Sequence, residues 1–165
     1  LGACLGPFNA FLFLQGRETL SLRMERHVAN AITIAEWLEQ HSAVERVSFA
    51  GLASSPYREL AERYLPRGAG SIFAFDLRGG RDQACAFVEG LRVWSHLANV
   101  GDAKSLVIHP MSTTHQQLTE EEAAGAGITP DMIRLSVGLE DVDDLIWALE
   151  QGFAAVRRCA VATGS

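Results

Sequence analysis

The stretch Met132-Ile-Arg-Leu-Ser-Val-Gly138, followed by Leu139-Glu-Asp-Val-Asp-Asp-Leu-Ile-Trp-Ala-Leu-Glu150, has the pattern of a strand that leads into a helix. Residues 132–137 are mostly apolar or β-branched and end at a glycine, which predicts a strand. The second part gathers acidic residues at its start, where the helix dipole favours negative charge, and then repeats apolar residues on one helical face: Val142, Leu145, Ile146, Leu149 and Phe153. A strand that leads directly into a helix is a building unit of α/β folds.

The segments before this stretch continue the alternation. Three further apolar or aromatic runs predict strands at Val44–Phe49, Ser71–Leu77 and Ser105–Ile108. Helices are predicted from Ser55 to Pro66 and from Arg81 to Trp94, because Pro or Gly residues bound both segments. The sequence therefore predicts an α/β sandwich with about four strands and with helices packed on the sheet.

The N-terminal part predicts one long helix from Pro7 to Gln40. Apolar residues recur at helical spacing from Leu20 to Leu38, and Gly16 offers an alternative in which the helix is kinked or interrupted. A helix of this length would extend about 51 Å, whereas a chain of this size has a radius of gyration of roughly 15 Å. Residues 8–14 have no polar face, so we expect them to pack against a missing domain or a partner subunit rather than to be buried within this chain.

Composition limits the class of protein. The chain has 165 residues, of which 48% are apolar, and a net charge of -6. This length allows one full-sized domain, the composition argues against disorder, and no apolar run reaches the ~18 residues of a membrane-spanning helix. The acidic balance and the scattered arginines argue against a nucleic-acid partner.

The cysteines, the histidines and the first residue bear on the compartment, on metal binding and on the extent of the protein. Three widely spaced cysteines make a disulfide framework or a zinc site improbable, and they favour a reducing compartment such as the cytoplasm. The five histidines show no metal-ligand spacing, so we predict no metal site. The chain starts with Leu rather than Met, so we interpret it as part of a longer protein.

Arg134 is the first candidate for a binding residue. It is the one basic residue among nine acidic ones between Thr119 and Glu150, and it lies inside an apolar strand pattern. A buried guanidinium needs an anionic partner. That partner is either a neighbouring carboxylate or the carboxylate of a substrate, and the residues alone leave both open.

Lys104 is the second candidate, because it is the only lysine in the sequence. A lysine can form a Schiff base when its pKa is depressed. The adjacent Asp102 would stabilise the ammonium group, so a surface lysine is the better interpretation. No phosphate-binding loop, dinucleotide-binding glycine motif or nucleophile elbow is present.

Several long motifs resemble one family in the correct order. They are the stretches Ser95–Pro110, Ser112–Thr119 and Ile133–Asp141, together with Leu1–Leu12 and Thr19–His27. These stretches closely resemble the C-terminal part of the Cys/Met-metabolism family of pyridoxal-phosphate enzymes, from the first residue to about Val156. The resemblance is greatest to the branch that uses O-acetylhomoserine and sulfide.

The resemblance implies a fold and an organisation. It implies the small C-terminal domain of aspartate-aminotransferase-like, fold-type I enzymes, with a largely antiparallel sheet. The expected division is a connecting helix region at residues 1–40, the small domain at residues 41–156 and a tail at residues 157–165. It also implies a missing N-terminal large domain and a homo-oligomer, commonly a tetramer.

The resemblance also implies roles for residues. Arg134 matches the residue that binds the α-carboxylate of the amino-acid substrate, which favours the substrate over a salt bridge as its partner. Ser105 is expected beside the cofactor and substrate, contacting the substrate through its backbone, and Thr114 is expected near the same pocket. Lys104 does not match the cofactor lysine, which lies upstream in the family.

The implied activity is a transferase reaction of methionine biosynthesis. The whole enzyme would use pyridoxal phosphate to convert O-acetylhomoserine and sulfide to homocysteine and acetate, and this chain alone would be inactive, with no catalytic residue of its own. The alternatives are a related cystathionine γ-synthase or γ-lyase, or a free-standing, non-catalytic α/β binding module.

Overall fold

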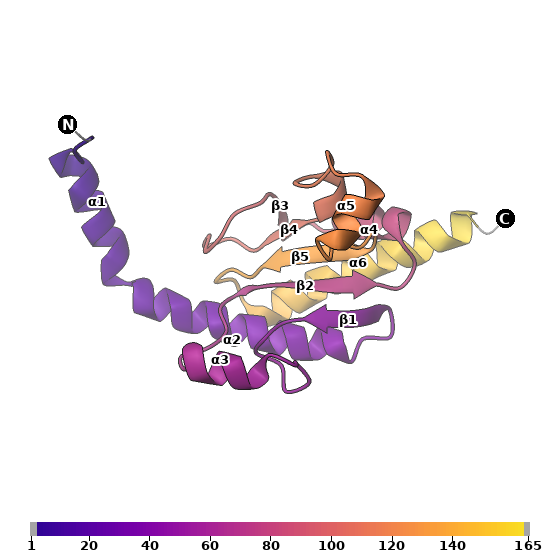
Figure 1. The fold of residues 1–165 in the computed structure, drawn as a ribbon, viewed down its shortest axis with the longest axis horizontal. Coiled ribbons are helices and arrows are strands. Elements are labelled where there is room, and N and C mark those ends of the chain that lie inside the picture. The colour runs from indigo at the N-terminus through magenta and orange to yellow at the C-terminus, as the bar shows by residue number, and fades with distance from the viewer. Residues whose placement is uncertain (1–2, 164–165) are drawn as a thin grey trace.

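The computed structural model describes residues 3–163, which form a five-stranded sheet with helices on both sides (Figure 1). The strands are β1 (Val44–Ser48), β2 (Ile72–Leu77), β3 (Ser95–His96), β4 (Leu106–Ile108) and β5 (Met132–Ser136). The helices are α1 (Pro7–Glu18), α2 (Leu20–Glu39), α3 (Arg58–Tyr64), α4 (Arg81–Glu89), the short 3-10 helix η1 (Pro110–Ser112), α5 (Glu120–Gly125) and α6 (Val142–Thr163).

The strand order is β1-β2-β5-β4-β3. Neighbouring strands are antiparallel except β3 and β4, which are parallel. The expected mixed α/β fold with a largely antiparallel sheet is confirmed, and the strand number is five because β3 adds an edge strand that the sequence did not predict.

The helix predicted from Arg81 to Trp94 is too long. It ends at Glu89, and the backbone N–H of Gly90 donates to the carbonyls of Ala86 and Phe87. Trp94 is buried although it lies outside the helix, and its indole N–H donates to the Leu145 carbonyl at 3.3 Å. Its apolar side chain therefore continued the helical pattern without belonging to a helix.

The predicted continuous helix from Pro7 to Gln40 is divided at Thr19, where the backbone leaves helical geometry with φ -104° and ψ 11°. Gly16, the expected position of a kink, lies within α1. The Arg23 guanidinium donates to the Gly16 carbonyl at 2.7 Å and also to the Thr19 hydroxyl, so it caps the end of α1. Helix α1 consequently turns away from the direction of α2 (Figure 1).

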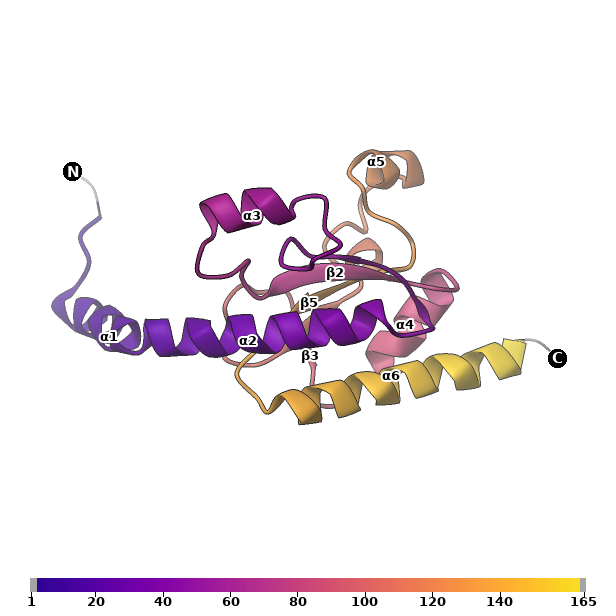
Figure 2. The same ribbon diagram turned by 90° about the horizontal axis from the view of Figure 1, so that it is seen from below.

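The core lies on one face of the sheet, under α2, α4 and α6 (Figure 2). Alternate strand residues point into it, including Phe73, Phe75 and Leu77 of β2 and Ile133 and Leu135 of β5. Three phenylalanine rings join strand to helices: the Phe75 ring centroid lies 5.6 Å from that of Phe87, and Phe87 lies 4.8 Å from Phe153. This face accounts for most of the buried apolar side chains.

The other face of the sheet carries the intervening residues. On β5 these are Met132, Arg134 and Ser136, and on β2 they are Ala74 and Asp76. Helices α3 and α5 lie on this side of the sheet (Figure 2). The face opposite the core therefore carries the polar residues Arg134, Ser136 and Asp76 beside the buried apolar side chains of Leu106 and Ile108.

The two ends of the described chain are helical. Helix α6 continues to Thr163, so residues 157–163 of the tail predicted at 157–165 extend the last helix instead, while residues 164–165 lie outside the described residues. At the other end, α1 has no buried residue, and Phe8 and Phe13 are each 70% exposed. No helix in the described residues is long and apolar enough to span a membrane.

Candidate functional site

Arg134 lies at the middle of β5, opposite Ala74 of β2 and Ile108 of β4. Its side chain projects from the face opposite the core and is partly buried. Among the residues that the structure describes, no hydrogen bond or ion pair reaches its guanidinium. No carboxylate of the described residues therefore forms the salt bridge considered for Arg134. Its guanidinium is available to an external anion.

Asp76 is the carboxylate that the register of β2 places on the same face, opposite Met132. It is already engaged. The Arg46 guanidinium donates to one Asp76 carboxylate oxygen from Nε at 2.9 Å and from Nη2 at 2.7 Å, while the Thr129 hydroxyl donates to the other at 3.2 Å. Arg134 is thus left without this internal partner.

Ser105 lies immediately before β4 and is fully buried. Its backbone N–H and its hydroxyl donate to the two oxygens of the Glu140 carboxylate, at 2.7 and 2.8 Å, and the hydroxyl accepts the N–H of Gly138 at 2.8 Å. Its carbonyl accepts the N–H of Ser95. The polar groups of Ser105 therefore join the start of β4 to the turn after β5, and a contact with substrate remains a prediction.

The turn at residues 137–140 is also fixed by α2. The Asn30 amide donates to the carbonyls of Gly138 and Glu140 at 3.1 and 2.9 Å, and the Nδ1–H of His27 donates to the Val137 carbonyl at 2.6 Å. Both side chains are buried. Helix α2 and the strand that carries Arg134 are consequently held as one unit.

Thr114 lies in the loop that follows η1, and its side chain is exposed and bonded to the ring of His115. The base of this loop is fixed by buried His109. The His109 Nε2–H donates to the Pro130 carbonyl at 2.8 Å, which leaves Nδ1 to accept from the Ser112 hydroxyl at 2.8 Å. The structure thus anchors this loop beside the start of β5, and the predicted role of Thr114 stays a prediction.

Ser136 shares the Arg134 face of β5 and is 2% exposed. Within the described part of the chain, its hydroxyl oxygen is the buried side-chain polar atom that lacks a hydrogen-bond partner. A buried hydroxyl without a partner is costly and calls for an explanation. Two polar groups of the same strand face, Arg134 and Ser136, thus lack a partner from the described chain.

Lys104 is exposed in the loop before β4. Its backbone N–H donates to the Asp102 carboxylate at 3.1 Å, and this bond is the main cause that lowers the pKa of Asp102, followed by the Asn99 side chain. No group of three or more His, Cys, Asp or Glu side chains suited to a metal occurs among the described residues.

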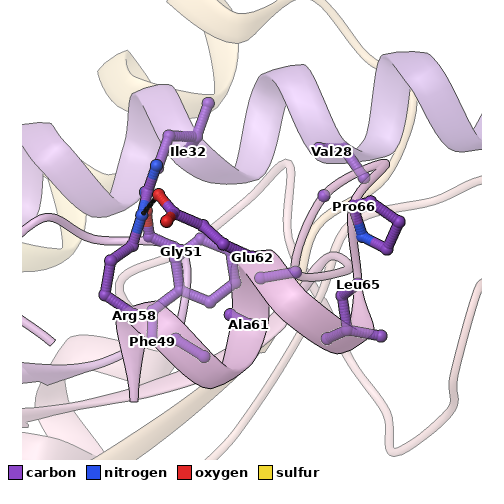
Figure 3. A pocket seen from close by; sticks show the side chains of 12 residues that line it. Val28, Ile32, Phe49, Gly51, Arg58, Ala61, Glu62, Leu65 and Pro66 are labelled. Carbon is purple, nitrogen blue, oxygen red and sulfur yellow. Dashed lines mark hydrogen bonds and ion pairs between the residues drawn. The ribbon is translucent and has the colours of Figure 1, made fainter. Parts of the chain in front are cut away.

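An apolar pocket of about 390 Å³ lies between α2 and α3 (Figure 3). Val28 and Ile32 of α2 form one wall, Ala61 of α3 and Leu65 just after this helix form another, and Phe49 contributes between them. The ion pair of Arg58 and Glu62, with Nε to Oε1 at 2.7 Å, lies at its edge. The predicted site residues Arg134, Ser105 and Thr114 are not among those that line it.

Sequence reasoning missed the residues that support the site. Glu140 was included among the acidic residues at the start of the last helix, yet its carboxylate holds Ser105, 35 positions away. Nothing in the local sequence around Arg46 or Asp76 indicates their pairing. Only their register on β1 and β2 brings them together, and no local spacing reveals it.

The sheet order and the long N-terminal helices form an α/β domain, and its structural neighbours are fold-type I pyridoxal-phosphate enzymes. Residues 1–154 match the model of the family described as Cys/Met metabolism PLP-dependent enzyme. The chain therefore belongs to this family.

Two curated relatives illustrate the similarity. The chain is 50% identical over 155 residues to the O-acetyl-L-homoserine sulfhydrylase of Corynebacterium glutamicum, covering 94% of this chain and 36% of the relative. It is 53% identical over 146 residues to the homocysteine synthase of Schizosaccharomyces pombe, covering 88% of this chain and 34% of the relative. The chain thus spans about a third of the length of these relatives.

Solved structures give the same result. An O-acetylhomoserine (thiol)-lyase structure from Campylobacter jejuni, which contains N′-pyridoxyl-lysine-5′-monophosphate, matches with a TM-score of 0.84 and 44% identity, over 92% of this chain and 36% of that one. A cystathionine gamma synthase from Xanthomonas oryzae, in complex with aminoacrylate and cysteine, matches with a TM-score of 0.83 and 41% identity, over 92% and 39%.

Proposed function

We propose that this chain is the substrate-binding domain of a pyridoxal-phosphate-dependent sulfhydrylase that converts O-acetylhomoserine and sulfide to homocysteine and acetate in methionine biosynthesis. The observation that carries this proposal is Arg134, a partly buried guanidinium with no anionic partner among the described residues. The names of the relatives at about 50% identity support the choice of reaction.

Arg134 would bind the α-carboxylate of the amino-acid substrate. A guanidinium can donate two parallel hydrogen bonds to a carboxylate, which fixes the direction of the substrate as well as its position. Because β5 is paired on both sides, by β2 and β4, the backbone that carries this side chain is rigid. The contribution of Arg134 to the reaction is therefore orientation of the bond that reacts.

The residues of this chain fit a substrate carboxylate better than they fit the cofactor. Lys104 is exposed in the loop before β4, whereas a Schiff-base lysine is held in a pocket that activates its amine. We infer that pyridoxal phosphate and its lysine are held by a large domain outside this chain, so none of the described residues is assigned a catalytic role. Ser105 and Thr114 would form one wall of the proposed substrate pocket around Arg134.

The isolated chain is accordingly expected to have no turnover. It is also expected to form no lasting adduct with added pyridoxal phosphate, which absorption spectroscopy would detect. A lysine adduct that forms in the chain and disappears in Lys104→Ala would contradict this assignment.

The proposed carboxylate site is tested in the full-length protein with Arg134→Ala. We expect kcat/KM for O-acetylhomoserine to fall by about 100-fold or more, because hydrogen bonds to charged groups contribute about 1.5–3 kcal/mol each. The cofactor absorption spectrum should remain unchanged. Arg58→Ala, which removes an arginine that pairs with Glu62 at the surface, is the matched control and should leave kcat/KM unchanged. Equal kinetics for Arg134→Ala and the parent protein would refute the role of Arg134.

The finer assignments within the family belong to the same proposal. A γ-synthase reaction is the second candidate, because a cystathionine gamma synthase structure matches nearly as well as the thiol-lyase structure. Assays with sulfide and with cysteine as the second substrate separate the two reactions. We further propose a homotetramer in the cytoplasm, assembled mainly through the large domain, which light scattering of the full-length protein would test.

A further inference from the structure

We propose that Arg46 is a positioning residue that keeps Arg134 free for substrate, because it holds Asp76, a carboxylate on the same sheet face that could otherwise pair with Arg134. This inference rests on the proposed role of Arg134 and adds a residue to it. Arg46 lies on β1, with β2 between it and the strand that carries Arg134.

The register of the sheet sets up a competition for Asp76. Asp76 lies directly opposite Met132, and Arg134 is two residues further along β5, on the same face. Such diagonal neighbours on adjacent antiparallel strands are about 7–8 Å apart at the backbone, which is within reach of a long side chain. Asp76 therefore lies between two arginines, Arg46 on one neighbouring strand and Arg134 on the other.

The contacts show which arginine holds it. Arg46 donates to Asp76 from two guanidinium nitrogens, at 2.9 and 2.7 Å, whereas no contact joins Asp76 to Arg134. The Asp76 side chain is only 8% exposed, so its charge needs a nearby donor or cation. The Arg46 side chain is 59% exposed, which means that it reaches inward from solvent to supply this cation.

Removal of Arg46 would leave Asp76 with Thr129 as its one remaining side-chain donor. A buried carboxylate in this position is expected to attract a cation within reach, and Arg134 is its diagonal neighbour on β5. An internal pair of Asp76 with Arg134 would then compete with the substrate carboxylate. The predicted result is weaker substrate binding without any change in the residues that contact the substrate.

The experiment uses the full-length protein and compares Arg46→Ala, Asp76→Asn and the double variant. We expect Arg46→Ala to raise KM for O-acetylhomoserine about tenfold, the effect of one competing ion pair near the substrate, with a smaller change in kcat. Asp76→Asn should leave KM near that of the parent protein. The double variant should return KM to the parent value, because the competing charge is gone. Melting temperatures are measured beside KM, because loss of a structural role lowers stability, whereas a pair of Asp76 with Arg134 raises KM even where the melting temperature is kept.

Several outcomes decide the proposal. An unchanged KM in Arg46→Ala, or a double variant that stays as weak as the single one, overturns it. If Arg46→Ala does not fold, Arg46→Lys and Arg46→Gln take its place. The lysine variant should keep the parent KM, and the glutamine variant should raise it. Equal KM values for both variants would overturn the proposal. Arg134→Ala distinguishes the failure of the Arg46 proposal from the failure of the carboxylate site. An unchanged KM in Arg134→Ala refutes the carboxylate site itself.

Discussion

Gly138 shows how little freedom the turn behind the proposed site has. A Cβ atom at this position would lie 2.5 Å from both the carbonyl oxygen of Ala103 and the backbone nitrogen of Ser105. Both are backbone atoms in a region that the Glu140 carboxylate already holds. Only glycine therefore fits between the end of β5 and the start of β4.

We expect Gly138→Ala to lower the free energy of unfolding by about 1–3 kcal/mol, the usual effect of an overpacked site. The control is Gly125→Ala, because a Cβ at Gly125 would meet nothing within 4 Å. Urea denaturation of both variants measures the difference. Equal midpoints would show that the turn relaxes more easily than its contacts indicate.

His41 links stability to pH. Its ring stacks on Phe153 with centroids 3.8 Å apart, and burial lowers its pKa, although the Glu150 carboxylate acts in the opposite direction; Arg157 adds a smaller decrease. A pKa that is lower in the folded state means that protonation favours the unfolded state. Stability that is present at neutral pH is therefore lost as the pH falls.

The expected outcome is a drop in melting temperature between about pH 7 and pH 5 that is smaller in His41→Gln than in the parent chain. His96→Gln, at an exposed histidine, is the control and should keep the parent slope. A slope that is the same in all three proteins would show that other groups cause the acid sensitivity.

Arg134 could be singled out from the sequence because a charge in an apolar strand is conspicuous by itself. Asp76 and Arg46 could not, because the significance of each depends on strand register, which no local pattern encodes. The same holds for Glu140 and Ser105, which meet through a turn.

At the scale of elements, α4 and α6 approach each other closely at a glycine. A Cβ at Gly152 of α6 would lie 2.8 Å from the Phe87 ring and 2.9 Å from Leu91. Since α6 covers a large part of the core, this contact sets how deeply both helices pack on the sheet.

Gly152→Ala and Gly16→Ala are therefore expected to change stability in opposite directions. Alanine is favoured over glycine in a helix by about 0.8–1.0 kcal/mol, and Gly16 has open space around it, so Gly16→Ala should stabilise α1. The clash at Gly152 should outweigh this gain. Circular dichroism during thermal unfolding measures both, and stabilisation by Gly152→Ala would contradict the close packing.

Most elements could be predicted from apolar periodicity, but their ends could not. The break at Thr19 depends on capping by Arg23. Helix α4 ends earlier than predicted, and Trp94 reaches the core from the loop after it, where its indole N–H donates to Leu145 of α6. Strand β3 has only two residues and exists because it pairs with β4. Contacts between distant residues fix these ends, and they produce no periodic pattern in the local sequence.

At the scale of the whole molecule, α1 stands out. Phe8, Phe11, Leu12, Phe13 and Leu14 are each more than half exposed. An apolar surface of this kind marks a contact with another part of the protein or with another chain. The isolated chain is therefore expected to self-associate through this helix.

Light scattering tests this expectation. Replacing Phe8 and Phe13 together with Glu should shift the isolated chain towards the monomer mass. Tyr64→Glu changes a residue of similar exposure on α3 and should leave the mass distribution unchanged. Equal association in both variants would show that α1 is not the contact.

The alternation along β5 has a consequence for how this protein can evolve. Ile133 and Leu135 face the core while Arg134 faces the opposite side, and each neighbouring strand keeps the same alternation. Substitutions on one side can accumulate without disturbing the other. A single inserted or deleted residue in β5 cannot, because it would exchange the two sides at once and turn the guanidinium into the core. Length variation should therefore be confined to the loops of this fold, whereas the strand itself diverges by substitution alone.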